Sequence, residues 1–272
     1  PTHSGAFYAT GDNTEPSFGT LPIAQGGTGE TTVAAARNAF GLGNTTGALP
    51  IANGGTGATS ENNARINFGF LNNAGAHNSI YRGISLGTSV SAAQYAAISA
   101  GTFEDMYIGD YWKINSVVWR IAAFDYYLTT GDTACDTHHV VIVPDTNLYS
   151  HKMNDSNVTT GGYVGSKMYT QGLADAKTAI NNAFGASHIL SHRQYLCNAV
   201  TNGYPSGGSW YDSKVELMTE QNVYGGKVMS PMGNGATVVA NYTVDKSQYP
   251  LFVHDPHMIS NRQNFWLRDV VS

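Results

Sequence analysis

Two pairs of histidines are spaced closely enough to suggest a metal site. His188 and His192 are four residues apart in a stretch, 187–200, that we expect to be helical, so both imidazoles would lie on one helix face. No His-Glu-x-x-His pattern supplies a base and a further ligand. The adjacent residues His138 and His139 would point to opposite faces of a strand, so at most one of them could join a given site. We therefore expect no metal and no cofactor.

The carboxylates offer a second kind of chemistry. Glu216 and Glu220 are four residues apart in a predicted helix, 214–224. Two carboxylates that cleave a glycosidic bond must approach the sugar from opposite sides, which one helix face seldom allows. A solvated acidic face is the simpler interpretation.

Nucleophilic catalysis has no better support. Ser206 and Ser209 lie in a Gly/Ser-rich stretch without the Gly-x-Ser-x-Gly pattern of a nucleophile elbow. Cys197 and His192 are five residues apart on the expected helix, where they would point in different directions. We therefore predict that the protein is not an enzyme, and interpret Cys135 and Cys197 as buried thiols, with a disulfide between them as the alternative.

Aromatic residues among small polar ones are the positive signal. Tyrosine and tryptophan stack on sugar rings or on partner side chains, while serine and asparagine adapt their hydrogen bonds, a combination typical of binding loops. One such stretch surrounds 204–211, where Trp210 could instead fill the core, and a second precedes the C-terminal segment, where a scaffold role is the alternative. The predicted contact residues are Tyr204, Trp210, Tyr211, Tyr242, Tyr249 and His254.

The composition favours the same class of partner. Charged residues make up only 12% of the 272 residues, against about a quarter in average proteins. With a net charge of -5 and no basic cluster, the chain is poorly suited to bind nucleic acid. No apolar stretch approaches the roughly 20 residues of a membrane span, so we expect no membrane insertion.

The elements that must position these residues begin with a repeat. The sequence Leu-Pro-Ile-Ala-Gln-Gly-Gly-Thr-Gly at 21–29 returns at 49–57 with one change, and the offset of 28 residues continues to the phenylalanine that closes each unit. Thr31 or Thr32, and Ser60, could cap a short helix in each unit. Each unit is too small to bury a core, so we expect three chains to associate. The predicted trimer contacts are Ile23, Phe40, Ile51 and Phe68.

A compact domain is predicted to follow. We place the boundary between 1–76 and 77–272, and expect an α+β fold in the second part. The expected helices are 92–98, 164–184, 187–200 and 214–224. The expected strands are 111–114 and 117–121, joined at Asn115-Ser116, then 139–143 and 265–272.

Two motifs resemble known families. The doublet Leu-Pro-Ile-x-x-Gly-Gly-Thr-Gly, with the Phe-Gly close, resembles the short repeats of bacteriophage tail fibres, which implies a trimeric shaft. Trp-Leu-Arg-Asp at 266–269 resembles the C-type-lectin-like domains of phage receptor-binding proteins, including targets of diversity-generating retroelements. In those relatives the strand leads into a variable stretch, so we expect the natural protein to continue beyond Ser272, and the residue Pro1 is consistent with a fragment.

These resemblances imply a function. We expect a homotrimeric tail fibre tip in the virion, assembled in the cytoplasm of the bacterial host, that attaches to other tail or baseplate proteins. Its receptor would be a bacterial surface polysaccharide or protein. The alternatives are a surface-polysaccharide-degrading enzyme and a docking module for another virion protein.

Overall fold

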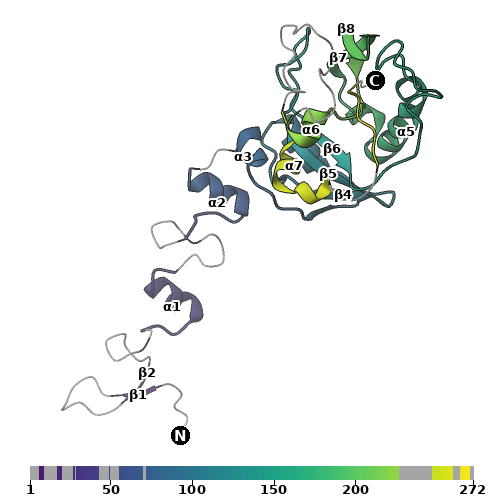
Figure 1. Cartoon of the computed structure of the whole chain (residues 1–272). Coiled ribbons are helices and arrows are strands. Elements are labelled where there is room, and N and C mark those ends of the chain that lie inside the picture. Colours follow the sequence, from purple (N-terminus) through teal and green to yellow (C-terminus); the bar gives the residue numbers. More distant parts are fainter. Residues whose placement is uncertain are drawn as a thin grey trace. The chain divides into compact units, whose positions relative to one another are not determined.

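The chain consists of two compact units (Figure 1). The computed structural model describes residues 6–8, 17–19, 27, 29–42, 49, 55–69, 72–226, 247–259 and 264–269. The N-terminal unit is Pro1–Leu71 and the C-terminal unit is Asn72–Ser272. The short helix α3 (Ala74–Asn78), which a boundary at 76 would divide, belongs wholly to the C-terminal unit.

The N-terminal unit contains two matching helices, α1 (Val33–Ala39) and α2 (Glu61–Asn67), after a small antiparallel pair, β1 (Ala6–Tyr8) and β2 (Ser17–Gly19). The predicted caps are confirmed. The side chain of Thr32 accepts a hydrogen bond from the Ala35 amide at 3.1 Å, and Ser60 accepts one from Asn63 at 3.2 Å. Each cap supplies a partner for an N–H group that the helix cannot satisfy itself.

Both helices also end in the same way. Phe40 and Phe68 are the C-caps, each with a φ of −84°. The glycine that follows each has a left-handed backbone, with φ +72° at Gly41 and +82° at Gly69, a conformation that favours glycine at a helix end. The sequence repeat is therefore also a repeat of local structure. Ile23 and Ile51 lie outside the described residues.

The C-terminal unit is built on a four-stranded sheet in the order β3-β4-β5-β6. Its strands are β3 (Ser85–Gly87), β4 (Tyr111–Ile114), β5 (Val117–Phe124) and β6 (Val140–Pro144), with β3 parallel to β4 and the other neighbours antiparallel. The predicted turn at Asn115-Ser116 is confirmed, with φ values of +51° and +67°. Helix α4 (Ala92–Ser99) has a capping box at Ser91, and α7 (Pro250–His254) and the 3-10 turn η6 (Pro256–Met258) follow later in the chain. The unit is α+β, as predicted.

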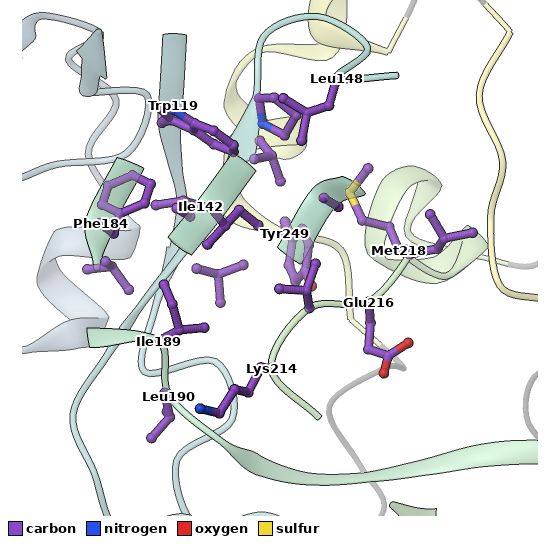
Figure 2. A pocket seen from close by; sticks show the side chains of 18 of the residues that line it. Trp119, Ile142, Leu148, Phe184, Ile189, Leu190, Lys214, Glu216, Met218 and Tyr249 are labelled. Carbon is purple, nitrogen blue, oxygen red and sulfur yellow. The ribbon is translucent and has the colours of Figure 1, made fainter. Parts of the chain in front are cut away.

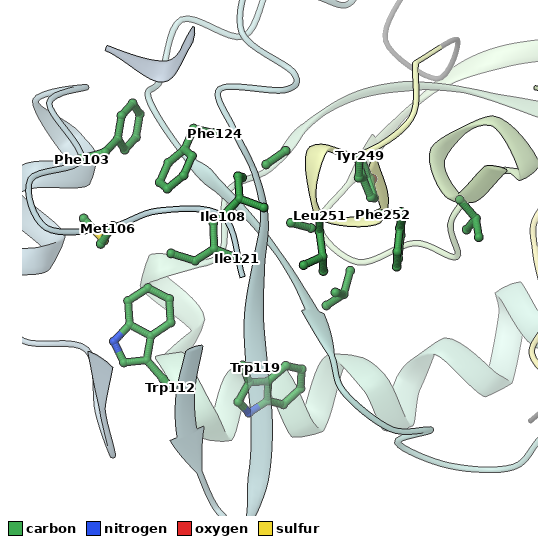
Figure 3. Packing of buried hydrophobic residues seen from close by; sticks show 14 of the residues in the cluster. Phe103, Met106, Ile108, Trp112, Trp119, Ile121, Phe124, Tyr249, Leu251 and Phe252 are labelled. Atoms are coloured by element: carbon green, nitrogen blue, oxygen red, sulfur yellow. The ribbon is translucent and has the colours of Figure 1, made fainter. Parts of the chain in front are cut away.

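Aromatic side chains dominate the core (Figure 3). Trp112 of β4 lies opposite Trp119 of β5, and both rings contact Phe184, with centroids 6.3 and 5.6 Å away. Phe184 ends helix α5 (Leu173–Phe184), which continues from the π-helical turn η3 (Met168–Gly172), so the predicted helix 164–184 is confirmed in its main part. Trp119 is only 1% exposed.

The predicted helix 187–200 is wrong. After a 3-10 turn, η4 (Ala186–His188), the chain forms a long antiparallel hairpin from β7 (His192–Thr201) and β8 (Tyr204–Ser213). Asn202 and Gly203 form its turn with φ values of +51° and +79°. The sequence Asn-Gly favours positive φ at both central residues of a two-residue hairpin turn. This turn preference explains why the segment forms a hairpin although its composition is typical of a helix.

Two further predictions need correction. Within the predicted helix 214–224 only α6 (Glu220–Tyr224) is helical, and residues 265–269 of the predicted final strand are not a strand. Instead Arg268 donates its amide to the Met218 carbonyl at 3.0 Å and its guanidinium to Gln194 at 3.1 Å. Asp269 accepts from the Glu220 amide at the start of α6. The partners are one main-chain carbonyl, one side chain and the start of α6, and they form no strand ladder. Residues 270–272 lie outside the described residues.

Across the described ranges, no helix combines the length and the apolar character that a bilayer crossing requires.

Candidate binding face on the β7–β8 hairpin

The β7–β8 hairpin brings two aromatic rings together on one face. Tyr195 lies directly opposite Trp210, and the rings meet edge to face with centroids 5.4 Å apart and an interplanar angle of 70°. Both side chains are half-buried. Edge-to-face packing sets the orientation of the two rings relative to each other. Trp210 therefore neither lies in a loop nor fills the core.

A group of charged residues adjoins this pair. Arg193 and Asp212 are the next opposed residues on the same face, because side chains alternate along a strand, and their side chains form an ion pair of 3.1 Å. Arg193 also contacts Asp132 through two bonds of 2.7 and 3.0 Å. These hydrogen bonds raise the pKa of Arg193, and the bond from Arg193 lowers the pKa of Asp132. We call Asp132, Arg193, Tyr195, Trp210 and Asp212 the hairpin face.

Small polar residues extend from the hairpin face to the hairpin tip. Asn198 donates to the Ser209 hydroxyl at 2.8 Å, and the hydroxyl of Thr201 donates to that of Ser206 at 2.9 Å. Ser206 and Ser209 are thus strand residues paired across the hairpin, which does not suit a nucleophile. Tyr204 follows the turn and is 54% exposed.

The other predicted contact residues are distributed differently. Tyr211 lies opposite Gln194 on the inner face of the hairpin, near the ring of Tyr169. Tyr249 is 4% exposed and its hydroxyl lies 3.0 Å from that of Tyr127, so the prediction of a contact role for Tyr249 is wrong: its side chain belongs to the core. His254 is exposed at the end of α7, where its ring lies 3.1 Å from the Asn78 carbonyl. Tyr242 lies outside the described residues.

Tyr195, Arg193 and Asp132 were not predicted as site residues. One signal was available: a turn centred on Asn202-Gly203 fixes the register of the hairpin, and that register places Tyr195 opposite Trp210. No sequence signal connects Asp132 with Arg193, which are 61 residues apart.

A large cavity lies behind the inner face of the hairpin (Figure 2). It measures about 1330 Å³, and its walls are mostly apolar, with Trp119 and Ile142 of the sheet and Phe184 of α5 among them. Lys214 and Glu216 contribute polar groups.

Glu216 is a partly buried carboxylate with two hydrogen-bond donors. It accepts from the Tyr163 hydroxyl at 2.8 Å and from Ser213 at 2.6 Å. Burial raises the pKa of Glu216 despite these donors and the nearby charge of Arg268. Glu220 is buried as well, at the start of α6. The prediction of a solvated acidic helix face is therefore wrong, because Glu216 precedes the helix and neither side chain is exposed.

The predicted histidine pair is also separated. His188 stacks on Tyr95 with centroids 3.8 Å apart, whereas His192 lies in β7 beside Tyr127. The Nε2 atom of His192 accepts from Gln194 at 2.8 Å, and Gln194 in turn accepts from Arg268, which orients the amide. Burial, with smaller effects from His139 and Arg268, lowers the pKa of His192 to about 4. The side chain of His192 is therefore uncharged at neutral pH.

His138 and His139 contact the same carboxylate in different ways, His138 through its ring and His139 through its main chain. The ring of His138 lies 2.7 Å from Asp125, and the main-chain amide of His139 donates to the same carboxylate at 2.9 Å. The two residues precede β6, so strand alternation does not separate them. The Nε2 atom of His139 accepts from the Tyr127 amide, and burial lowers the pKa of His139. These histidines hold the segment before β6.

Within the described ranges, no three or more histidine, cysteine, aspartate or glutamate residues are grouped so as to hold a metal ion. Cys135 and Cys197 are free and buried, as predicted. Burial raises the pKa of Cys197, which disfavours the thiolate. Cys197 packs with Leu196 and Tyr163, whereas the ring of His192 lies against Tyr127.

Comparison with models of known protein families, with curated protein sequences and with solved structures finds no significant match.

Proposed function

We propose that this chain is the distal part of a bacteriophage tail fibre, with a homotrimeric repeat shaft and a C-type-lectin-like domain that binds a bacterial surface receptor. The N-terminal unit, Pro1–Leu71, would form the shaft, and the C-terminal unit, Asn72–Ser272, the receptor-binding domain. Other tail or baseplate proteins are its partners in the virion.

The observation that carries this proposal is the repeated helix with its exposed phenylalanine. Phe40 is 57% exposed and Phe68 62% exposed, at equivalent positions 28 residues apart. None of the residues of α1 is buried. A large apolar side chain that recurs in the same exposed position is explained if copies of the chain cover it. Threefold association is supported by the likeness of the repeat motif to tail fibre repeats.

The hairpin face supports the adhesive role of the C-terminal unit. Its aromatic pair lies on two hydrogen-bonded strands and not on a loop, so less conformational entropy would be lost on binding than for a pair on a loop. Three such faces on one trimer would bind a repetitive surface with an avidity far above the affinity of each site.

The first experiment is to determine the mass of the purified full chain by light scattering coupled to size exclusion. Three copies of the 29.0 kDa chain give about 87 kDa, which is the expected result. A monomer at micromolar concentration would contradict the shaft.

A second experiment tests adhesion. Fluorescently labelled trimer is expected to bind bacterial cells of a susceptible host and not to release reducing sugar ends from their envelopes. Binding to virions but not to cells would contradict a receptor-binding role and favour the docking module, and sustained sugar release would favour the enzyme.

A further inference from the structure

We propose that the cavity behind the β7–β8 hairpin binds a free long-chain alkyl carboxylate, with the alkyl chain against its apolar walls and the carboxylate at Lys214. The inference concerns a site distinct from the hairpin face and does not depend on the proposed function.

The size of the cavity is the first argument for a ligand. Protein interiors contain few voids larger than a water molecule, whereas this space measures about 1330 Å³. Binding sites for small molecules measure about 300 to 1,000 Å³ and have mostly apolar walls with a few polar groups. The cavity has walls of this kind, and apolar cavities take up apolar molecules more readily than water.

The shape of one wall favours an elongated ligand. Leu173, Ala176, Ile180 and Phe184 of α5 line the cavity, and their spacing of three or four residues places them on one side of the helix. At about 1.5 Å per residue, this wall is about 16 Å long, which is comparable with an extended dodecyl chain. The residues of β6 line the cavity as well. An alkyl chain would therefore meet apolar side chains along its length.

The charged side chains of the walls indicate the head group. Lys214 lines the cavity and is exposed, so its ammonium group lies where the cavity opens to solvent (Figure 2). Among the described residues, Lys214 has no ion-pair partner. The carboxylates of Asp145 and Glu216 also line the cavity, but Asp145 pairs with Arg120 and Glu216 accepts two hydrogen bonds. A carboxylate on the ligand would give Lys214 the opposite charge that the walls do not provide.

Carboxylates of increasing chain length test the apolar part of the site on the full-length chain. Octanoate, decanoate and dodecanoate are titrated in competition with the fluorescent probe 11-(dansylamino)undecanoic acid, below the concentrations at which they form micelles. Each step of two carbons should tighten binding about fifteenfold, because each buried methylene contributes a factor of about four. Equal affinities for the three carboxylates would overturn the role of the alkyl chain.

A pair of tryptophan substitutions assigns the chain to the cavity. Ile189 is a half-buried residue of the cavity wall, so Ile189→Trp fills part of the space and should weaken dodecanoate binding about tenfold (Figure 2). Val158→Trp is the matched control, because Val158 is 48% exposed and lies outside the cavity wall, and it should leave the affinity unchanged. Equal affinities in the two variants would show that the carboxylate binds elsewhere.

A pair of lysine substitutions tests the head group. Lys214→Met removes the charge but keeps an apolar stem. It should weaken dodecanoate binding about fivefold, the effect of one contact between exposed charges, and leave the binding of uncharged dodecanol unchanged. Lys113→Met, at an exposed lysine of β4, should change neither. Because Lys214 is exposed, this pair keeps the test valid even if Ile189→Trp does not fold.

The remaining outcomes would overturn the inference in part or in whole. An equal loss of dodecanoate and dodecanol binding in Lys214→Met would overturn the pairing of Lys214 with the carboxylate. Failure of the probe and of all three carboxylates to bind would overturn the site altogether. The proposed adhesive function would stand in both cases, because cell binding tests it separately.

Discussion

The two units use the same local devices but differ in what they bury. In the N-terminal unit, α1 is capped at both ends and yet has no buried residue. In the C-terminal unit, α4 is also capped, and its Gln94 accepts a hydrogen bond from the almost fully buried Trp112. Caps are thus sufficient to define a helix boundary, whereas the buried hydrophobic clusters formed by the described residues belong to the C-terminal unit.

From this difference we predict that the stability of the C-terminal unit does not depend on chain association, and that the N-terminal unit depends on the association proposed above. Four substitutions or conditions test that separation, each read out as the unfolding free energy of the C-terminal unit in the full-length chain.

Loss of a core tryptophan should have the largest effect. Trp119→Ala removes a side chain that is packed against Phe184 and Trp112, and should cost about 3 to 5 kcal/mol. Urea unfolding followed by near-ultraviolet circular dichroism measures this change. Trp266→Ala is the control, because that side chain is 54% exposed, and should cost under about 1 kcal/mol. Equal losses in the two variants would show that the core is not where we place it.

The next largest effect on the unfolding free energy should come from a substitution at one of two glycines that occupy equivalent helix ends. Gly41 and Gly101 follow the C-caps of α1 and α4 with φ values of +72° and +69°. A Cβ at Gly101 would lie 2.6 Å from the His138 ring, whereas one at Gly41 meets nothing within 4 Å. Gly101→Ala should therefore cost about 2 to 4 kcal/mol, from backbone strain and collision together. Gly41→Ala should leave the C-terminal unit unchanged and cost the repeat helix only about 1 kcal/mol. A similar loss of C-terminal stability in both variants would break the separation of the units.

Acid should weaken the C-terminal unit through His192. Its pKa is about 4 in the folded chain against 6.5 for an ordinary histidine. Between these values the unfolded chain binds a proton that the folded chain does not, so stability falls as the pH is lowered from about 6.5 toward 4. The lowered pKa of His139 acts in the same direction, and the raised pKa of Glu216 opposes it.

His192→Gln isolates this contribution. Between pH 7 and pH 4.5 the variant should lose about 2 kcal/mol less stability than the parent chain, since each unit of pKa shift corresponds to about 1.4 kcal/mol. Parallel stability curves over this range would mean that His192 does not resist protonation.

Elements with local signals could be predicted from the sequence. The β4–β5 hairpin, α4 and α5 follow from β-branched or apolar periodicity together with a turn or a cap beside each of them. The β7–β8 hairpin was missed because histidine, arginine, glutamine and alanine suggest a helix, while the decisive signal, Asn202-Gly203, lies at its end. Residues 265–269 were misassigned because their partners, Gln194 and Met218, are distant in the sequence.

The candidate site, like the fold, could be predicted from the sequence only where the signal was local. Aromatic composition identified Trp210, but its partner Tyr195 depends on the strand register, and Asp132 depends on a fold-level contact with Arg193. Tyr249 was predicted as a contact residue because it is a tyrosine near other aromatic and polar residues. Its burial in the structure, which the sequence does not reveal, assigns it to the core. Composition therefore indicates the chemistry of a surface, whereas the residues that complete it are set by contacts distant in sequence.

Substitution of the two repeated phenylalanines should have the smallest effect on the unfolding free energy of the C-terminal unit. It should also show the clearest difference between the two units. Phe40→Ser with Phe68→Ser removes the two exposed rings while the caps and glycines remain. If other copies of the chain cover these rings, each loses apolar burial in the assembly, and the mass should fall from about 87 kDa toward 29.0 kDa.

The unfolding free energy of the C-terminal unit should stay within about 0.5 kcal/mol of the parent, because neither ring contributes to its core. Asn38→Ser, an exposed change on the same helix, is the matched control and should leave a trimer. A double variant that remains trimeric would show that the rings do not hold the chains together. One that dissociates and also destabilises the C-terminal unit would show that association supports both units, and the contrast drawn between them would be wrong.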